Sequence, residues 1–129
     1  MPYSHSIMGR HLRYRLWIAA LNHDIDSIRI FDDYLGEAQY KKTSTDNTAR
    51  IDHFKKQFTV QRKEIDELRH SMHLLKMKLA SEAKEGHAQS EEALAVDHHP
   101  ELEKRYQDFR KSFHQFTEEF NSFVDESLL

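Results

Sequence analysis

The chain has 129 residues, about the length of one domain, and its net charge of −3 gives no basic excess of the kind that marks nucleic-acid-binding domains. Because there is no cysteine, disulfide frameworks, thiolate metal sites and cysteine nucleophiles are excluded. Three glycines and two prolines are too few for a turn-rich sheet protein and favour a few long helices. The apolar run at 16–21 is too short for a signal peptide or a membrane span, so we expect a cytoplasmic protein.

The first predicted element is a long helix from about residue 10 to 42, preceded by an aperiodic segment, 1–9, that we expect to be flexible. Along this helix apolar residues recur in alternating steps of three and four, which places them in one row, or seam, on one side. Asp24 is its one charged member. The first seam consists of Tyr14, Trp17, Leu21, Asp24, Ile28, Phe31, Leu35 and Ala38.

A cluster of turn and N-cap residues at 43–48 predicts a tight reversal, followed by a second helix from about residue 46 to 85. At 1.5 Å per residue, a helix of this length is about 60 Å long. Its seam has no break, and a straight seam needs partner helices to cover it. Gln61 is the one polar member of this second seam, which consists of Ile51, Phe54, Phe58, Gln61, Ile65, Leu68, Met72, Leu75 and Leu79.

Residues 87–97 are the predicted loop before a third helix, which begins at Pro100 and continues to about residue 128. Its seam is rich in phenylalanine, and since flat rings fill more width than leucine, we expect it to face two partner helices. The short first connection and longer second one predict helices that run up, down and up. The sequence thus predicts an all-α fold, in which 1–129 form a single antiparallel bundle of three long helices with coiled-coil-like heptad packing. The third seam consists of Leu102, Tyr106, Phe109, Phe113, Phe116, Phe120 and Phe123.

Asp24 and Gln61 interrupt otherwise apolar seams. With a reversal near residue 45, Asp24 is expected beside about position 66 of the second helix, within a turn of Arg62 and Arg69. The favoured interpretation is a buried polar layer that fixes the helix register, as a buried Asn does in coiled coils. The alternative is a ligand site in the bundle core.

Two pairs of Glu and His offer possible metal ligands. Glu67 and His70 form the Glu-x-x-His pattern of di-iron carboxylate bundles, and His114 and Glu118 are four residues apart, as in hemerythrin-like helices. If the neighbouring seam residues face the core, both pairs point outward. The favoured expectation is therefore no cofactor, and a bundle that binds iron or zinc is the alternative.

The segment Asp97-His98-His99 lies just before the third helix. Adjacent histidines in a loop can hold a metal ion at the surface. The favoured interpretation is a helix start that carries polar side chains.

Basic residues are concentrated at 41–65, where seven Lys or Arg stand against three acids. The basic stretch 41–63 suggests, as a third hypothesis, an RNA-associated factor. Pairing between helices is the favoured explanation, because no Gly-rich loop or aromatic platform accompanies the basic residues.

The sequence lacks the Gly-rich phosphate loops and nucleophile-elbow patterns of common enzymes, so we expect a protein that is not an enzyme. Five large apolar residues lie off the seams and would stay exposed in a single bundle, which predicts a homodimer or higher oligomer. The leading hypothesis is a self-associating, non-enzymatic protein–protein interaction or scaffolding module. The five residues are Leu16, Ile30, Val60, Leu74 and Met77.

The segments 51–58, with the sequence IDHFKKQF, and 61–70, with the sequence QRKEIDELRH, resemble an uncharacterised family of short all-helical bacterial proteins. The resemblance implies no known activity. It draws attention to polar residues of the second helix, among which Gln57 and Glu64 are candidates for a polar surface. The full set is Gln57, Gln61, Glu64, Glu67 and His70.

Overall fold

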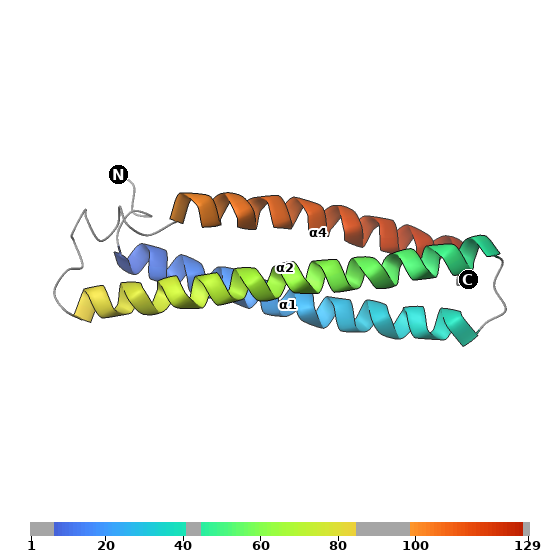
Figure 1. The fold of residues 1–129 in the computed structure, drawn as a ribbon, viewed down its shortest axis with the longest axis horizontal. Coiled ribbons are helices and arrows are strands. Elements are labelled where there is room, and N and C mark those ends of the chain that lie inside the picture. The colour runs from blue at the N-terminus through green and yellow to red at the C-terminus, as the bar shows by residue number, and fades with distance from the viewer. Residues whose placement is uncertain (1–6, 41–44, 85–98, 128–129) are drawn as a thin grey trace.

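The computed structural model describes residues 7–40, 45–84 and 99–127, which form three α-helices and include no strand. Helix α1 spans Ile7–Tyr40, α2 spans Thr45–Lys84 and α4 spans His99–Ser127. The helices lie side by side in one elongated bundle (Figure 1). The predicted all-α bundle of three helices is confirmed.

The start of α1 differs from the prediction, because the helix begins at Ile7 rather than near residue 10. The structure therefore places 7–9 in the helix rather than in the segment before it. The physical reason is burial: Ile7 is 1% exposed, and Ile7 and Arg10 continue the first seam backward from Tyr14 in steps of four and three. The other helix ends lie within two residues of their predicted positions. The predicted loop at 87–97 and the first six residues lie outside the described residues.

The order of the side-chain contacts gives the direction of each helix. From α1 to α4, Arg13 pairs with Glu103 and Phe31 contacts Phe116, so residue numbers rise together along these two helices. From α2 to α4 the order is reversed, since Arg50 pairs with Glu126 whereas Gln61 bonds to Ser112. Helix α2 therefore runs opposite to α1 and α4, as the ribbon also shows (Figure 1).

The three seams meet in one apolar core. Every position of the second seam is buried except Leu75, which is partly buried, and Trp17 and Phe31 are the partly buried members of the first seam. All members of the third seam, from Leu102 to Phe123, are buried. The heptad spacing thus identifies the inward side of each helix.

Phenylalanine rings from all three helices converge around Phe120 of α4. Its ring centroid lies 4.9 Å from that of Phe31 in α1, and 5.2 Å and 5.5 Å from those of Phe54 and Phe58 in α2. Aromatic pairs at these separations add to the free energy of burial. The expectation that the Phe-rich helix faces two partners is confirmed by these contacts.

The sides of the helices that face away from the core carry many charged residues, such as Asp52, Lys55 and Lys56 of α2. None of the described helices combines the length and the apolar character that a membrane span requires. The predicted cytoplasmic location stays a prediction.

Replacing Phe120 with Ala is expected to lower the free energy of unfolding by about 3–5 kcal/mol, because the change leaves a cavity among rings of three helices. Chemical denaturation followed by circular dichroism measures this change. The matched control is Val60→Ala, at a side chain that is 57% exposed, for which we expect a change within about 0.5 kcal/mol. Equal effects of the two substitutions would contradict this description of the core.

Candidate functional site

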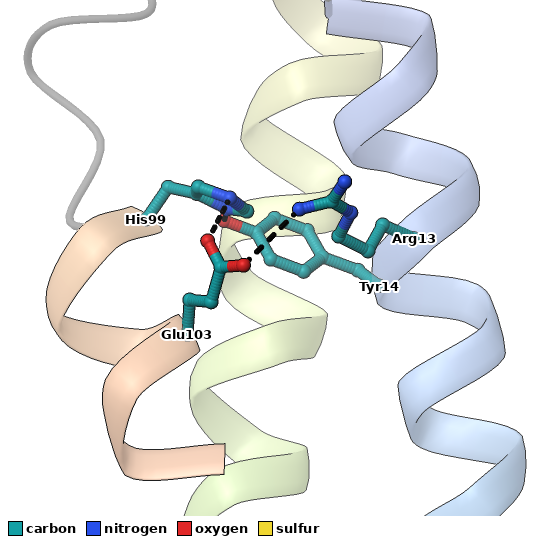
Figure 2. Close-up of polar contacts among 4 residues, drawn as sticks. All are labelled: Arg13, Tyr14, His99 and Glu103. Carbon is teal, nitrogen blue, oxygen red and sulfur yellow. Dashed lines mark hydrogen bonds and ion pairs between the residues drawn. The ribbon is translucent and has the colours of Figure 1, made fainter. Parts of the chain in front are cut away.

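A chain of four polar side chains links the first part of α1 to the first turn of α4 (Figure 2). The Tyr14 hydroxyl lies 2.8 Å from His99 Nδ1. His99 Nε2 lies 3.1 Å from one carboxylate oxygen of Glu103, and Arg13 Nη1 lies 3.3 Å from the other. We call this set the Tyr14–His99 network.

The helices position this network through their register. His99 and Glu103 are four residues apart and therefore share a face of α4, and this face meets α1 where Arg13 and Tyr14 lie. Trp17, one turn further along α1, covers the network: its ring stacks on His99 at 5.9 Å and on Tyr106 at 4.7 Å. The indole thus shields the polar contacts from water on one side.

Burial determines what the network can do chemically. Tyr14 is 0% exposed and His99 is 5% exposed. A neutral His99 with its proton on Nε2 satisfies both contacts, because it donates to Glu103 and accepts from the Tyr14 hydroxyl. A Tyr–His–Glu chain of this kind can relay a proton in an open active site. Here the hydroxyl at its end has no exposed surface for a substrate, so the network joins α4 to α1.

The sequence predicts a polar helix start that includes His99, whereas the structure places the His99 side chain in the core. The sequence does contain a signal that His99 is buried. His99 precedes Leu102 by three residues and Tyr106 by seven, so it occupies the seam position before the first leucine. The neighbouring predicted residues, Asp97 and His98, lie outside the described part of the chain.

Asp24 is buried, as the polar-layer hypothesis predicts, but its partner is different. Its carboxylate forms an ion pair with Arg110 of α4. Arg62 and Arg69, the expected partners on α2, instead lie 3.3 Å and 3.6 Å from Asp66 of their own helix. The physical reason is that Asp24 lies on the side of α1 that faces α4.

The aromatic surroundings of Arg110 support this ion pair. The guanidinium carbon lies 5.4 Å from the Tyr106 ring centroid and 5.3 Å from that of Phe109. Burial lowers the pKa of Arg110 from its ordinary value. An arginine pKa starts so far above neutrality that the side chain keeps its charge, and the charge compensates the buried Asp24 carboxylate.

Gln61 also bonds to α4. Its side chain is 6% exposed, and its Nε2 donates to Ser112 Oγ at 3.5 Å. The two polar seam residues, Asp24 and Gln61, are therefore satisfied separately by positions 110 and 112 of α4. Both partners come from within the bundle, which fits a register-fixing layer better than a ligand site.

The candidate polar surface on α2 belongs in part to another interhelical contact. Glu64 Oε1 lies 2.8 Å from Arg105 Nη2, and Glu67 Oε2 lies 3.4 Å from the same nitrogen. Arg105 of α4 thus bridges two carboxylates that are about one turn apart on α2. Gln57 lies half-buried on the same helix.

The four residues of the metal-binding alternative are not brought together. Glu67 contacts Arg105, whereas Glu118 lines a hollow with His53, which is 14 residues, or about 21 Å, from Glu67 along α2. His114 Nε2 lies 3.6 Å from Glu118 at an exposed position. In the described ranges, no group of three His, Asp or Glu residues is arranged to hold a metal ion.

Positive charges lie around His73, three residues beyond His70 on α2. The pKa of the nearby His73 is lowered first by burial and then by the positive charges of Lys76, Arg69 and His70. A positive local potential that opposes protonation of a histidine also opposes binding of a divalent metal ion.

Basic residues of the 41–63 stretch are mixed with acids. Arg50 lies 3.4 Å from Glu126 and stacks at 4.7 Å on the Phe123 ring. Lys55 and Lys63 border a groove between α1 and α2, whose lining also includes Asp32, Asp66 and Glu67. Lys41 and Lys42 lie outside the described residues. The RNA hypothesis therefore stays a prediction that no unmixed basic surface on the described helices supports.

No family model, curated protein or solved structure matches this chain. The resemblance of 51–70 to short helical bacterial proteins therefore stays a prediction. The hypotheses about function depend on the geometry described above and on the outer surfaces of the helices.

Replacing Arg110 with Met is expected to lower the free energy of unfolding by about 3 kcal/mol, because Asp24 is left buried without a cation. This value is at the lower end of the loss that is usual when one partner of a buried ion pair is removed, because the Arg110 side chain is 30% exposed. Replacing both residues, as Asp24→Leu with Arg110→Met, should recover most of the loss, which a double-mutant cycle measures. The control is Arg62→Met at an exposed pair, with an expected loss below about 1 kcal/mol. Additive losses in the cycle would contradict the pairing.

Replacing Tyr14 with Phe is expected to lower the free energy of unfolding by about 1–2 kcal/mol, since His99 Nδ1 loses its hydroxyl partner inside the core. The control is Tyr34→Phe, at a side chain that is 50% exposed, for which no measurable change is expected. Urea denaturation at neutral pH separates the two outcomes. If both variants were as stable as the parent chain, the hydroxyl contact would contribute nothing.

Proposed function

We propose that this chain is a non-enzymatic protein–protein interaction or scaffolding module that associates with partners, including itself, through apolar helix faces. The observation that carries the proposal is a set of large apolar side chains that are at least half exposed. All of those identified lie on α1 or α2. They are Met8, Leu12, Leu16, Ile30 and Tyr34 on α1, and Val60, Leu74 and Met77 on α2.

The spacing of these residues supports an interface rather than scattered exposure. Single apolar residues on a surface are common and need no explanation. Met8, Leu12 and Leu16, however, follow one another in steps of four and are 63%, 57% and 61% exposed, so they form a continuous strip. Contiguous exposed apolar surface marks interaction sites, because water is released when a partner covers it.

Helix α4 gives an internal comparison. Its large apolar side chains in the described range, from Leu102 to Val124, are buried or partly buried. Apolar exposure is thus concentrated on two of the three helices, which favours an interface on those helices.

Several polar groups with possible chemical roles are engaged in contacts between helices. The Tyr14 hydroxyl is bonded to His99 in the core, and the Asp24 carboxylate is paired with Arg110. Glu67 contacts Arg105. These contacts support a structural role for the residues from which an acid–base or metal site would otherwise be built.

Cellular crosslinking tests the proposal. A variant with Leu12→Glu and Leu16→Glu, and a second with Leu74→Glu and Met77→Glu, should keep the parent circular dichroism spectrum and unfolding midpoint, since these side chains are exposed. At least one of the two variants should give about tenfold less crosslinked product, whether the crosslinked partner is another protein or a second copy of the chain. The reason is that a charge in an interface must be desolvated. The control carries Glu at two exposed lysines, Lys55 and Lys56. Identical crosslinked species from the parent chain and both Glu variants would contradict the proposal.

A further inference from the structure

One stripe of exposed residues follows α1 along most of its length. Its members are spaced by four, four and three residues in turn, which gives a repeat of 11 residues. At about 3.67 residues per turn, such a repeat stays almost straight along an α-helix. All members are exposed except Ser27, which is half-buried and donates to the His23 carbonyl at 3.2 Å. We call this the α1 stripe, and it consists of Met8, Leu12, Leu16, Ala19, His23, Ser27, Ile30 and Tyr34.

From Leu12 to Tyr34, the α1 stripe is symmetric about His23. Leu16 and Ile30 lie seven residues on either side of His23, and Leu12 and Tyr34 lie 11 residues on either side. A two-fold axis through His23 would therefore place Leu16 against Ile30 of a second copy, and Leu12 against Tyr34. Two-fold symmetric dimers require a self-complementary patch of this kind.

Charge selects the antiparallel direction. Arg10 and Asp24 are buried and Arg13 pairs with Glu103 of α4, so they do not contribute to an outer surface. Of the exposed charges on α1, residues 7–23 hold one arginine, Arg15, and no acid, whereas 24–40 hold four acids and one arginine. An antiparallel pair places the basic half of each copy against the acidic half of the other, and a parallel pair places like charges together. Opposite charges on facing surfaces favour the correct orientation and disfavour the wrong one.

Arg15 and Asp33 form the specific pair. They are 18 residues apart, about five helical turns, so they lie on the same flank of α1. In an antiparallel pair with a two-fold axis near residue 23, the same flanks of the two helices meet, and Arg15 then faces Asp33 of the second copy. Both side chains are exposed, and neither forms an ion pair with another residue of the described helices.

The acidic half of the stripe also has room for side chains of a second copy. Ile30 and Tyr34 border a hollow of about 390 Å³ between α1 and α4. It is lined further by the apolar Phe31, Phe120 and Val124 and by the polar Asn121 and Asp125. In the antiparallel arrangement, the exposed Leu12 and Leu16 of the second copy lie over this hollow. Apolar side chains that cover the apolar part of this hollow gain both burial and packing.

From these observations we infer that the α1 stripe binds a second copy of this chain, with the two α1 helices antiparallel about a two-fold axis near His23. The inference rests on the interaction function proposed above and names its partner.

Cysteine crosslinking tests the geometry, and the chain has no cysteine of its own to interfere. The His23→Cys variant should form a disulfide-linked dimer under mild oxidation, because the two positions meet at the axis within disulfide reach. Leu12→Cys alone should stay monomeric in non-reducing gels but crosslink when mixed with Tyr34→Cys. The control is Val60→Cys, at a position of α2 that is 57% exposed. A parallel pair would instead crosslink Leu12→Cys to itself, and that result, or equal crosslinking of His23→Cys and Val60→Cys, overturns the inference.

A charge swap gives an independent test by sedimentation. Arg15→Asp and Asp33→Arg are each expected to weaken self-association by about tenfold, because each places like charges face to face twice. Mixing the two variants should restore association, since each interface contact then pairs opposite charges, and the double variant should associate like the parent chain. The control is Lys56→Asp, with an expected unchanged dissociation constant.

The failures of the two proposals are distinguishable. A dimer that is insensitive to changes at 15 and 33 but is broken by Val60→Glu or Leu74→Glu would overturn the α1 assignment and leave the interaction function standing. A strict monomer would overturn the inference. The interaction function would still stand if replacing Leu12 and Leu16 with Glu removed a crosslinked protein other than a second copy of this chain. It would be overturned if that replacement removed no crosslinked protein.

Discussion

The mutual burial of three apolar seams is the constraint on which the rest of the structure depends. Long helices as rich in charge as these gain most of their stability from packing one side against a partner. The Phe120 ring, which contacts Phe31 of α1 and Phe54 of α2, lies where the three seams meet. Because each helix gives one side to this shared core, its remaining side chains either lie at the edge of the core or stay outside it.

Three polar groups at the core edge bond to α4, at different levels along that helix. Tyr14 contacts α4 at residue 99, Asp24 contacts it at residue 110, and Gln61 contacts it at residue 112. If α4 slid by one turn, apolar contacts would re-form in part with other seam residues, whereas these directional contacts would all be lost. Polar residues in an apolar seam thus act as register markers, at some cost in burial energy.

Helix α1 combines two patterns that do not compete. Its inward seam repeats every seven residues and packs on α2 and α4, whereas the α1 stripe repeats every 11 residues on the outside. A side chain on the stripe contributes little to folding, because it is exposed in both the folded and the unfolded chain. The stripe can therefore be apolar, and the exposed charges beside it can be unevenly distributed along α1, without loss of fold stability. The apolar stripe and the charges beside it therefore affect association with a partner rather than folding.

Hydrophobic periodicity alone was enough to identify three helices and their inward sides, because it is a local property of the chain. The same spacing, extended backward from Tyr14 and from Leu102, reaches Ile7 and His99. The periodicity therefore also indicates that these two residues lie in the core. The partner of Asp24 could not be found in this way. Spacing gives the level of a residue along the bundle, but whether a side chain at the edge of a seam meets α2 or α4 depends on the order of the helices around the bundle axis. The same periodicity permits either order, so the contacts of Asp24 with Arg110 and of Tyr14 with His99 emerge only when the packed helices are seen together.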